Sequence, residues 1–429
     1  MKMKKYLVMG LLLITASAYA ADNLKYGANL RLRQEYWGDV MDLNSNAGRN
    51  PNFFRIKSSG WAKYDVNSDL GLYLKITNES RYYLTHSVAA NDNTWDGSEI
   101  IFDNFYLDAK NVCKLPLDIR AGRQDFLGVY GDGFILMDGT PGDGSRTFYF
   151  NAIKSTYRFN DKNSMDLVFI NSQKQDNALP IIDSKKTGIN NCDEFGIMLY
   201  GKNTLNEKTT LEEYLINKVE KSNPDLTLNT IGARTVCKMD PWKFRGELAI
   251  QSGDYANVSI SRTGMGMQAY ATRSFKEAKF SPEAELGLIY LSGDDCTTND
   301  KVEGWNPIYS RWPMLSELVI FTYATEPGAG MAYWTNLTCV RLSGKMAINK
   351  KATLALIYNM LSANQKTLAG GIYSGTGTNR GQLPQVRFGY KFSDRIDSYA
   401  LYEYFIPGDF YTTTCNAASF FRWNVDVKF

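Results

Sequence analysis

The connections between strand-like segments constrain the fold of this chain more than any single segment does. About eighteen segments alternate apolar and polar residues with period two, which is typical of half-exposed β-strands. With the N-terminus on the inner side, every second connection is short, as at Asn67-Ser68 and Met239-Asp240. Most of the others are long, although those near 220–224 and 253–263 are less extended. The segments span residues 24–37, 52–66, 69–84, 99–110, 116–124, 151–160, 163–171, 193–202, 207–219, 225–238, 241–252, 264–274, 282–293, 330–343, 350–361, 382–392, 395–406 and 419–429.

This asymmetry is typical of bacterial outer-membrane proteins, which have short periplasmic turns, long extracellular loops and an even number of strands. A β-sandwich or β-helix gives no reason for it. The sequence therefore predicts an all-β protein, a single transmembrane antiparallel β-barrel of about 18 strands.

Both ends of the chain agree with that fold. Met1 to Lys5 carry three lysines, a short apolar run follows, and Ala18-Tyr19-Ala20 has the small-residue pattern of a signal peptidase site. The last segment, SFFRWNVDVKF, has one apolar and one charged face and ends on Phe429, which resembles the C-terminal signal of outer-membrane barrels. We expect a signal peptide at 1–20, a barrel domain at 21–429 and a location in the bacterial outer membrane.

Composition excludes several other classes of protein. The mean hydropathy of −0.33 argues against a bundle of membrane helices, and a net charge of +3 gives no reason to expect a nucleic-acid partner. The aromatic content of 13% fits interfacial girdles or a carbohydrate-stacking surface. The six scattered cysteines lack metal-site spacing, and their pairing stays open, with a minor structural role expected.

The polar faces of the strands predict what lines the lumen. If the apolar faces meet lipid, Arg33, Arg55, Arg158, Arg245 and Arg387 point inward. Rings of basic residues favour anions, and guanidinium groups bind carboxylates in bidentate fashion. Alternatively, these arginines pair with neighbouring acidic residues, as in any charged, water-filled lumen.

The region 118–158 mixes glycine and aspartate between Arg123 and Arg146. These residues favour turns, so the loop at 125–150 is expected to fold into the lumen as a constriction or gate. Its aspartate spacing does not fit an EF-hand, which leaves calcium binding a weak alternative. We expect no cofactor and no metal.

Several motifs, in order along the chain, resemble the alginate export family of outer-membrane barrels. That resemblance implies an eighteen-stranded barrel whose arginine-rich, electropositive pore lets a uronic-acid polysaccharide leave the cell. It carries Arg33, Arg55, Arg123 and Arg146 over as pore-lining residues. The motifs are LRLRQEYW (30–37), GRQDF (122–126), GDGFILMDGTPGDGSRT (131–147), YLSGDDCTTNDKVEGWNPIYSRWP (290–313) and YEYFIPGDFY (402–411).

Together these features predict an outer-membrane channel with an arginine-lined, anion-selective pore for passive export of an acidic polysaccharide. Its partners would be the anionic polysaccharide or oligosaccharide, outer-membrane lipids and periplasmic export components. A second hypothesis is an uptake porin for small anionic sugars or organic acids, and a third is an adhesive barrel with a plugged lumen. An enzyme is not expected, because the single histidine, His86, lies beside Ser87, which places the two side chains on opposite faces of a strand.

Overall fold

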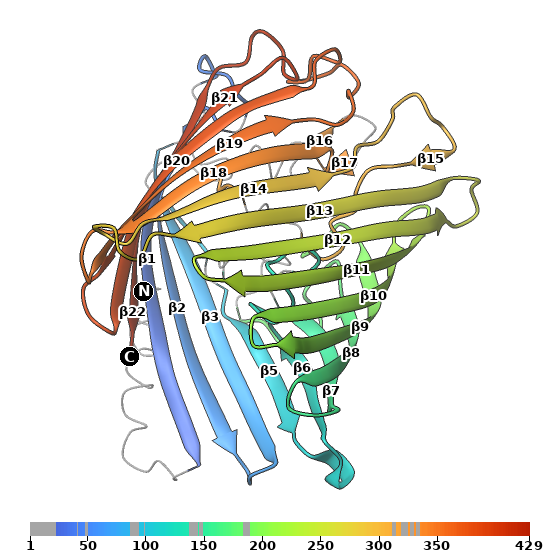
Figure 1. The fold of residues 1–429 in the computed structure, drawn as a ribbon, viewed down its shortest axis with the longest axis vertical. Helices are drawn as coiled ribbons and strands as arrows, with labels where there is room; N and C mark the ends of the chain where they lie inside the picture. Colours follow the sequence, from blue (N-terminus) through green and yellow to red (C-terminus); the bar gives the residue numbers. More distant parts are fainter. Residues whose placement is uncertain are drawn as a thin grey trace.

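The computed structural model is a closed antiparallel β-barrel (Figure 1). It describes residues 23–429 except 41, 48–49, 86–93, 98, 137–144, 146–148, 183–188, 311–314, 319–324, 327–329 and 332–334. The predicted signal peptide therefore lies outside the described residues. Within the described part of the chain, no helix is long and apolar enough to span a bilayer. A short 3-10 turn, Val112–Lys114, connects two strands.

The 20-stranded sheet contains eighteen long strands and two short ones, β4 (Thr94–Asp96) and β15 (Lys301–Val302). Two further short strands, β16 (Thr325–Glu326) and β17 (Gly330–Met331), pair with each other outside this sheet. Each long strand overlaps one of the predicted segments, and most ends differ by a few residues. The strand Leu337–Ala347 begins seven residues later than the predicted segment 330–343. The long strands are β1 (Leu24–Gly38), β2 (Asn52–Asp65), β3 (Leu70–Thr85), β5 (Ile101–Ala109), β6 (Leu117–Gln124), β7 (Phe150–Arg158), β8 (Asn163–Ser172), β9 (Asp193–Asn206), β10 (Thr209–Lys221), β11 (Leu226–Met239), β12 (Trp242–Tyr255), β13 (Ser261–Ser274), β14 (Glu283–Leu291), β18 (Leu337–Ala347), β19 (Ala352–Ser362), β20 (Asn379–Lys391), β21 (Ile396–Pro407) and β22 (Ala418–Lys428).

Neighbouring long strands pair in chain order, and the barrel closes where β1 pairs with β22. Figure 1 shows this closure, with the first strands in blue beside the last in red. Closure gives every long strand a partner on both sides, which satisfies backbone polar groups that lipid cannot hydrogen-bond. The predicted eighteen-stranded barrel is confirmed.

The two ends of the barrel differ as predicted. One end carries short turns such as 207–208 and 240–241, and the other carries long connections at 39–51, 86–100, 125–149, 173–192, 292–336, 363–378 and 408–417. By the convention of bacterial barrels, the short turns are periplasmic and the long loops extracellular.

Side chains alternate between the lipid-facing and inner surfaces of the wall. On β12, Leu248 and Ile250 are 49% and 54% exposed on the outside, whereas Glu247 and Ala249 are 3% and 0% exposed on the inside. The exposed apolar face is the surface that lipid would cover. The buried cluster inside combines strand residues with residues from the connections at 39–51, 125–149, 292–336, 363–378 and 408–417.

Candidate functional site

The described part of the 125–149 loop lies inside the barrel. Tyr130 donates a hydrogen bond to inward-facing Asp166 of β8 at 2.9 Å, and its ring lies 4.7 Å from that of Tyr200 on β9. Asp132 forms ion pairs with Arg234 of β11 and Arg245 of β12 at 3.0 and 2.8 Å. The loop therefore spans the wall from β8 to β12 and reduces the free cross-section of the lumen.

The 292–336 loop enters the lumen beside it. Trp305 stacks on Phe134 of the first loop with ring centroids 5.2 Å apart, and both rings lie over Gly266 of β13. A Cβ at Gly266 would be 2.6 Å from the Phe134 ring, so only glycine lets the two aromatic residues approach the wall this closely. On its other side this loop contacts the last strands, where Glu317 pairs with Arg422 of β22 at 2.9 Å.

Three arginines stand side by side on the inner face of β1, β2 and β3. Arg33 and Arg55 are register partners, and so are Arg55 and Arg81. We call these three residues the arginine row. Like charges directly opposite each other destabilise a sheet, so this arrangement has an electrostatic cost that the neighbouring carboxylates offset.

Two buried glutamates provide that compensation. Arg55 donates to Glu79 of β3 at 2.6 Å and lies 3.4 Å from Glu35 of β1. Glu79 also pairs with Arg31, and Glu35 also pairs with Arg422 at 2.6 Å. Among the described residues, the two glutamates are shared by five arginines, namely Arg31, Arg33, Arg55, Arg81 and Arg422.

Arg387 of β20 extends this basic wall through a tyrosine. Tyr399 of β21 accepts a hydrogen bond from Arg33 at 3.2 Å, and the guanidinium of Arg387 lies 4.2 Å from the centre of the Tyr399 ring. Arg387 is exposed, and no carboxylate partner is found for it among the described residues. The structure thus brings three of the predicted arginines, Arg33, Arg55 and Arg387, to one wall.

The other predicted arginines lie elsewhere. Arg245 of β12 pairs with Asp132 and with Glu285 of β14, at 2.8 and 3.0 Å. Arg158 lies at the periplasmic end of β7 and pairs with Asp118. These two arginines, like Arg33 and Arg55, have the acidic partners that the alternative interpretation of the lumen expected.

Arg123 has a different environment from the rest. It shares a strand face with its register partner Asn151, and its side chain is 1% exposed. Asp176 pairs with it at 2.7 Å, and the ring of Tyr149 stacks on its guanidinium at 4.1 Å. Arg146 and His86 lie outside the described residues.

Several basic side chains of the lumen were not singled out from the sequence. Arg81, Arg234 and Arg422 face inward beside the predicted arginines. Each of these arginines occupies the polar face of an alternating strand, so the sequence does indicate that it points inward. Which residues lie beside it depends on the pairing register of the strands.

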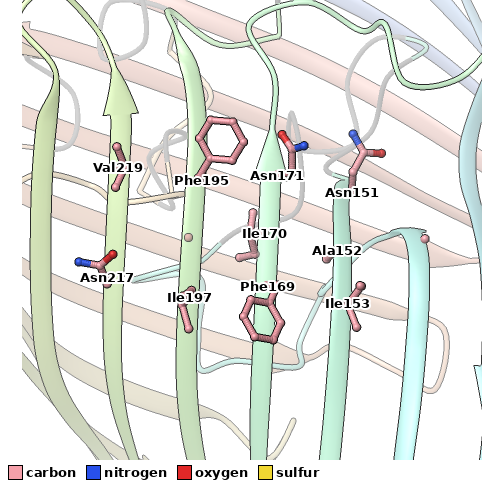
Figure 2. A pocket seen from close by; sticks show the side chains of 12 residues that line it. Asn151, Ala152, Ile153, Phe169, Ile170, Asn171, Phe195, Ile197, Asn217 and Val219 are labelled. Carbon is pink, nitrogen blue, oxygen red and sulfur yellow. The ribbon is translucent and has the colours of Figure 1, made fainter.

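An apolar hollow of about 590 Å³ lies on the outer wall over β6 to β10 (Figure 2). Ile153, Phe169, Phe195 and Ile197, which line it, are each more than two-fifths exposed. This hollow belongs to the lipid-facing surface and is not part of the lumen.

The six cysteines all lie in described segments, and none of them forms a disulfide. Among the described residues, no group of three or more histidine, cysteine, aspartate or glutamate side chains is arranged to hold a metal ion.

The sequence matches the family model described as Alginate export over residues 22–425. No curated protein sequence matches the chain.

Solved structures with a similar fold include several from Pseudomonas aeruginosa. OccK2 (OpdF) in complex with glucuronate has a TM-score of 0.60 at 11% identity, covering 95% of this chain and 98% of that chain. OccK7 (OpdD) has a TM-score of 0.59 at 10% identity, covering 95% of this chain and 99% of that chain. OpdK with vanillate has a TM-score of 0.56 at 10% identity, covering 94% of this chain and 98% of that chain. At such identities the likeness establishes the fold alone.

Proposed function

The chain belongs to the alginate export family of outer-membrane channels, and from this premise we propose that its lumen is an anion-selective path for passive export of an acidic, uronic-acid-type polysaccharide. The fold and family are those of channels, which are not enzymes, and they support an outer-membrane location. The finer proposal concerns the charge of the solute, its size and its direction.

The arginine row carries the proposal. Arg33, Arg55 and Arg81 lie on adjacent strands, and the two nearby glutamates are shared with Arg31 and Arg422. A water-filled lumen with low-dielectric walls focuses the field of these charges, which raises the local concentration of anions. This field would attract the regularly spaced carboxylates of a polyuronate, and Arg81, whose side chain is 35% exposed, would be the member of the row that contacts them. Arg158, Arg245 and Arg387 extend the proposed path, as would Arg146, which lies outside the described residues.

The two loops in the lumen are compatible with a polymer. A narrow path limits the cross-section of a solute and not its length, so a linear polysaccharide can pass end-on where a single sugar fits. The restriction acts against branched or folded solutes. Passage is proposed to be diffusive.

Planar-bilayer recording of the purified barrel tests the charge preference. In a KCl gradient the reversal potential should lie toward the chloride equilibrium potential, and polyuronate added on one side should reduce the current. Cation selectivity, or the same current with and without polyuronate, would refute the proposal.

A second candidate is uptake of small anionic sugars or organic acids. The similar folds of channels crystallised with glucuronate and with vanillate, both small carboxylates, favour it. Liposome swelling with uronates of increasing length separates the two candidates. Uptake restricted to mono- and disaccharides supports the second candidate, whereas rates that persist with longer chains support the first.

Export of the chain itself would depend on residues 1–20, which we propose are removed after Ala20. Mass spectrometry of the membrane-inserted protein should give a mature chain beginning at Ala21. A retained N-terminus would contradict this proposal. Docking of periplasmic export components stays a prediction.

A further inference from the structure

One carboxylate of the 125–149 loop lies between two arginines of the barrel wall. The two oxygens of Asp132 each accept from a different guanidinium, Oδ1 from Arg234 at 3.0 Å and Oδ2 from Arg245 at 2.8 Å. A single carboxylate thus bridges two adjacent strands, β11 and β12. This is the arrangement that a carboxylated solute would need in order to bind both arginines.

The two arginines also have permanent partners in the wall. Arg234 donates to Glu212 of β10 at 3.0 Å, and Arg245 donates to Glu285 of β14 at 3.0 Å. Those glutamates belong to strands, and the hydrogen-bond ladder of the barrel holds them in place. Asp132 belongs to a loop, so among the described carboxylate partners of these arginines it is the one whose backbone can move away without opening the sheet.

The loop tip carries features that place Asp132 without burying it. Gly131 and Gly133 flank it with positive φ angles of 63° and 80°, which glycine adopts without strain. Tyr130 and Phe134 anchor the tip on either side, through Asp166 and Trp305 respectively. The side chain of Asp132 is still 31% exposed and that of Arg245 is 21% exposed, so both are in reach of solvent and solute.

We propose that Arg234 and Arg245 form a binding site for a solute carboxylate and that Asp132 is a tethered competitor for it. The inference rests on the proposed function, because it concerns how an anionic solute is held in the lumen. An incoming uronate carboxylate takes the place of Asp132, accepts from the same two guanidinium groups, and is released when Asp132 returns.

Exchange of one carboxylate for another suits a channel. Two charge-assisted hydrogen bonds are lost and two are formed, so neither arginine is left buried without a partner. The tether gives Asp132 a high effective concentration at the site, which lowers the net affinity for the solute. Binding then stays weak enough to permit exit, as conduction requires.

The test is the affinity of the purified barrel for glucuronate in Asp132→Asn, measured by isothermal titration calorimetry and by block of the single-channel current. The neutral amide fits the same space but competes poorly for guanidinium groups. We expect glucuronate to bind about tenfold more tightly than in the wild type. In Asp132→Asn/Arg245→Gln this gain should disappear.

The matched control is Asp295→Asn in the 292–336 loop. Asp295 is also a loop carboxylate, and its hydrogen bonds go to the neighbouring Thr297, so the substitution removes one negative charge without uncovering these arginines. The control should bind glucuronate like the wild type.

An unchanged affinity in Asp132→Asn, or an equal gain in Asp295→Asn, would overturn the inference. Calorimetry does not depend on ion selectivity. An anion-selective wild type with unchanged affinity in Asp132→Asn would therefore refute the tethered competitor and leave the proposed function standing. A cation-selective wild type would refute the proposed function, whatever the affinities.

Discussion

Two parts of the inner wall hold arginines in contrasting ways. On β1 to β3 the arginine row is compensated by glutamates of the same strands, and Arg55 and Glu79 are almost fully buried. On β11 and β12, across the barrel in strand order, Arg234 and Arg245 share a carboxylate that a loop supplies. The first arrangement holds positive charge permanently in the wall and produces a fixed electrostatic field. In the second, the arginines become available to a solute carboxylate when it replaces Asp132.

The largest effect that should distinguish the two walls is on stability. Arg55→Ala removes the buried guanidinium that Glu35 and Glu79 share, while each glutamate keeps another arginine, and we expect a loss of about 1.5–3 kcal/mol. Arg245→Ala removes partly exposed pairs and should cost about 1 kcal/mol. Urea unfolding of the barrel in lipid vesicles measures both. Equal losses would mean that the two walls are held alike.

The packing of the loops predicts the next effect. In Gly266→Ala the new methyl group would contact Phe134 and Trp305, so both loops should loosen and the open-channel current should fluctuate more. Ion selectivity should not change, because the arginine row is untouched. Gly344→Ala on β18 is the control, since no atom lies within 4 Å of its added Cβ. Quiet recordings from Gly266→Ala would show that the loops are not held by this contact.

A smaller effect is expected at the edge of the basic wall. Arg387→Gln should reduce anion preference modestly and leave stability unchanged, because Arg387 is exposed and stacks on Tyr399. Arg273→Gln removes an arginine that stacks on Trp242 and Phe275, away from that wall, and serves as the control. The reversal potentials of the two variants in a KCl gradient measure this difference in anion preference. An equal shift in both variants would mean that overall charge, and not position, sets the preference.

The smallest effect is expected at the periplasmic turn 392–395. A hydrogen bond from Lys391 holds the pKa of Asp394 below its usual value. The pair therefore stabilises the fold at neutral pH, and this contribution is lost as the pH falls through the lowered pKa. Asp394→Asn should lower the urea midpoint only slightly at pH 7 and not at all at pH values below that pKa. A large change at neutral pH would contradict the view that exposed pairs matter little here.

The strands and their faces could be predicted from the sequence because period-two alternation is a local property. The polar face of 24–37 already contains Arg33, and that of 52–66 contains Arg55. That the two stand side by side could not be predicted, because register depends on pairing across the sheet.

The contacts that the long loops make with the barrel wall could not be predicted from the sequence either. Asp132 and Arg234 are 102 residues apart in the chain, and no periodicity links a loop to a strand at that distance. Arg123 illustrates the same point, since its partners Tyr149 and Asp176 come from the separate connections 125–149 and 173–192.

The most direct test of the central claim is the reversal potential of Arg33→Gln/Arg81→Gln in a KCl gradient, compared with the wild type. This double variant keeps Arg55 and its buried glutamates, so the barrel should remain folded while the arginine row loses two of its charges. The wild type should be anion-selective, and the variant should shift clearly toward the potassium equilibrium potential. A wild type and variant with the same reversal potential would contradict the claim that the arginine row sets the charge preference of the lumen.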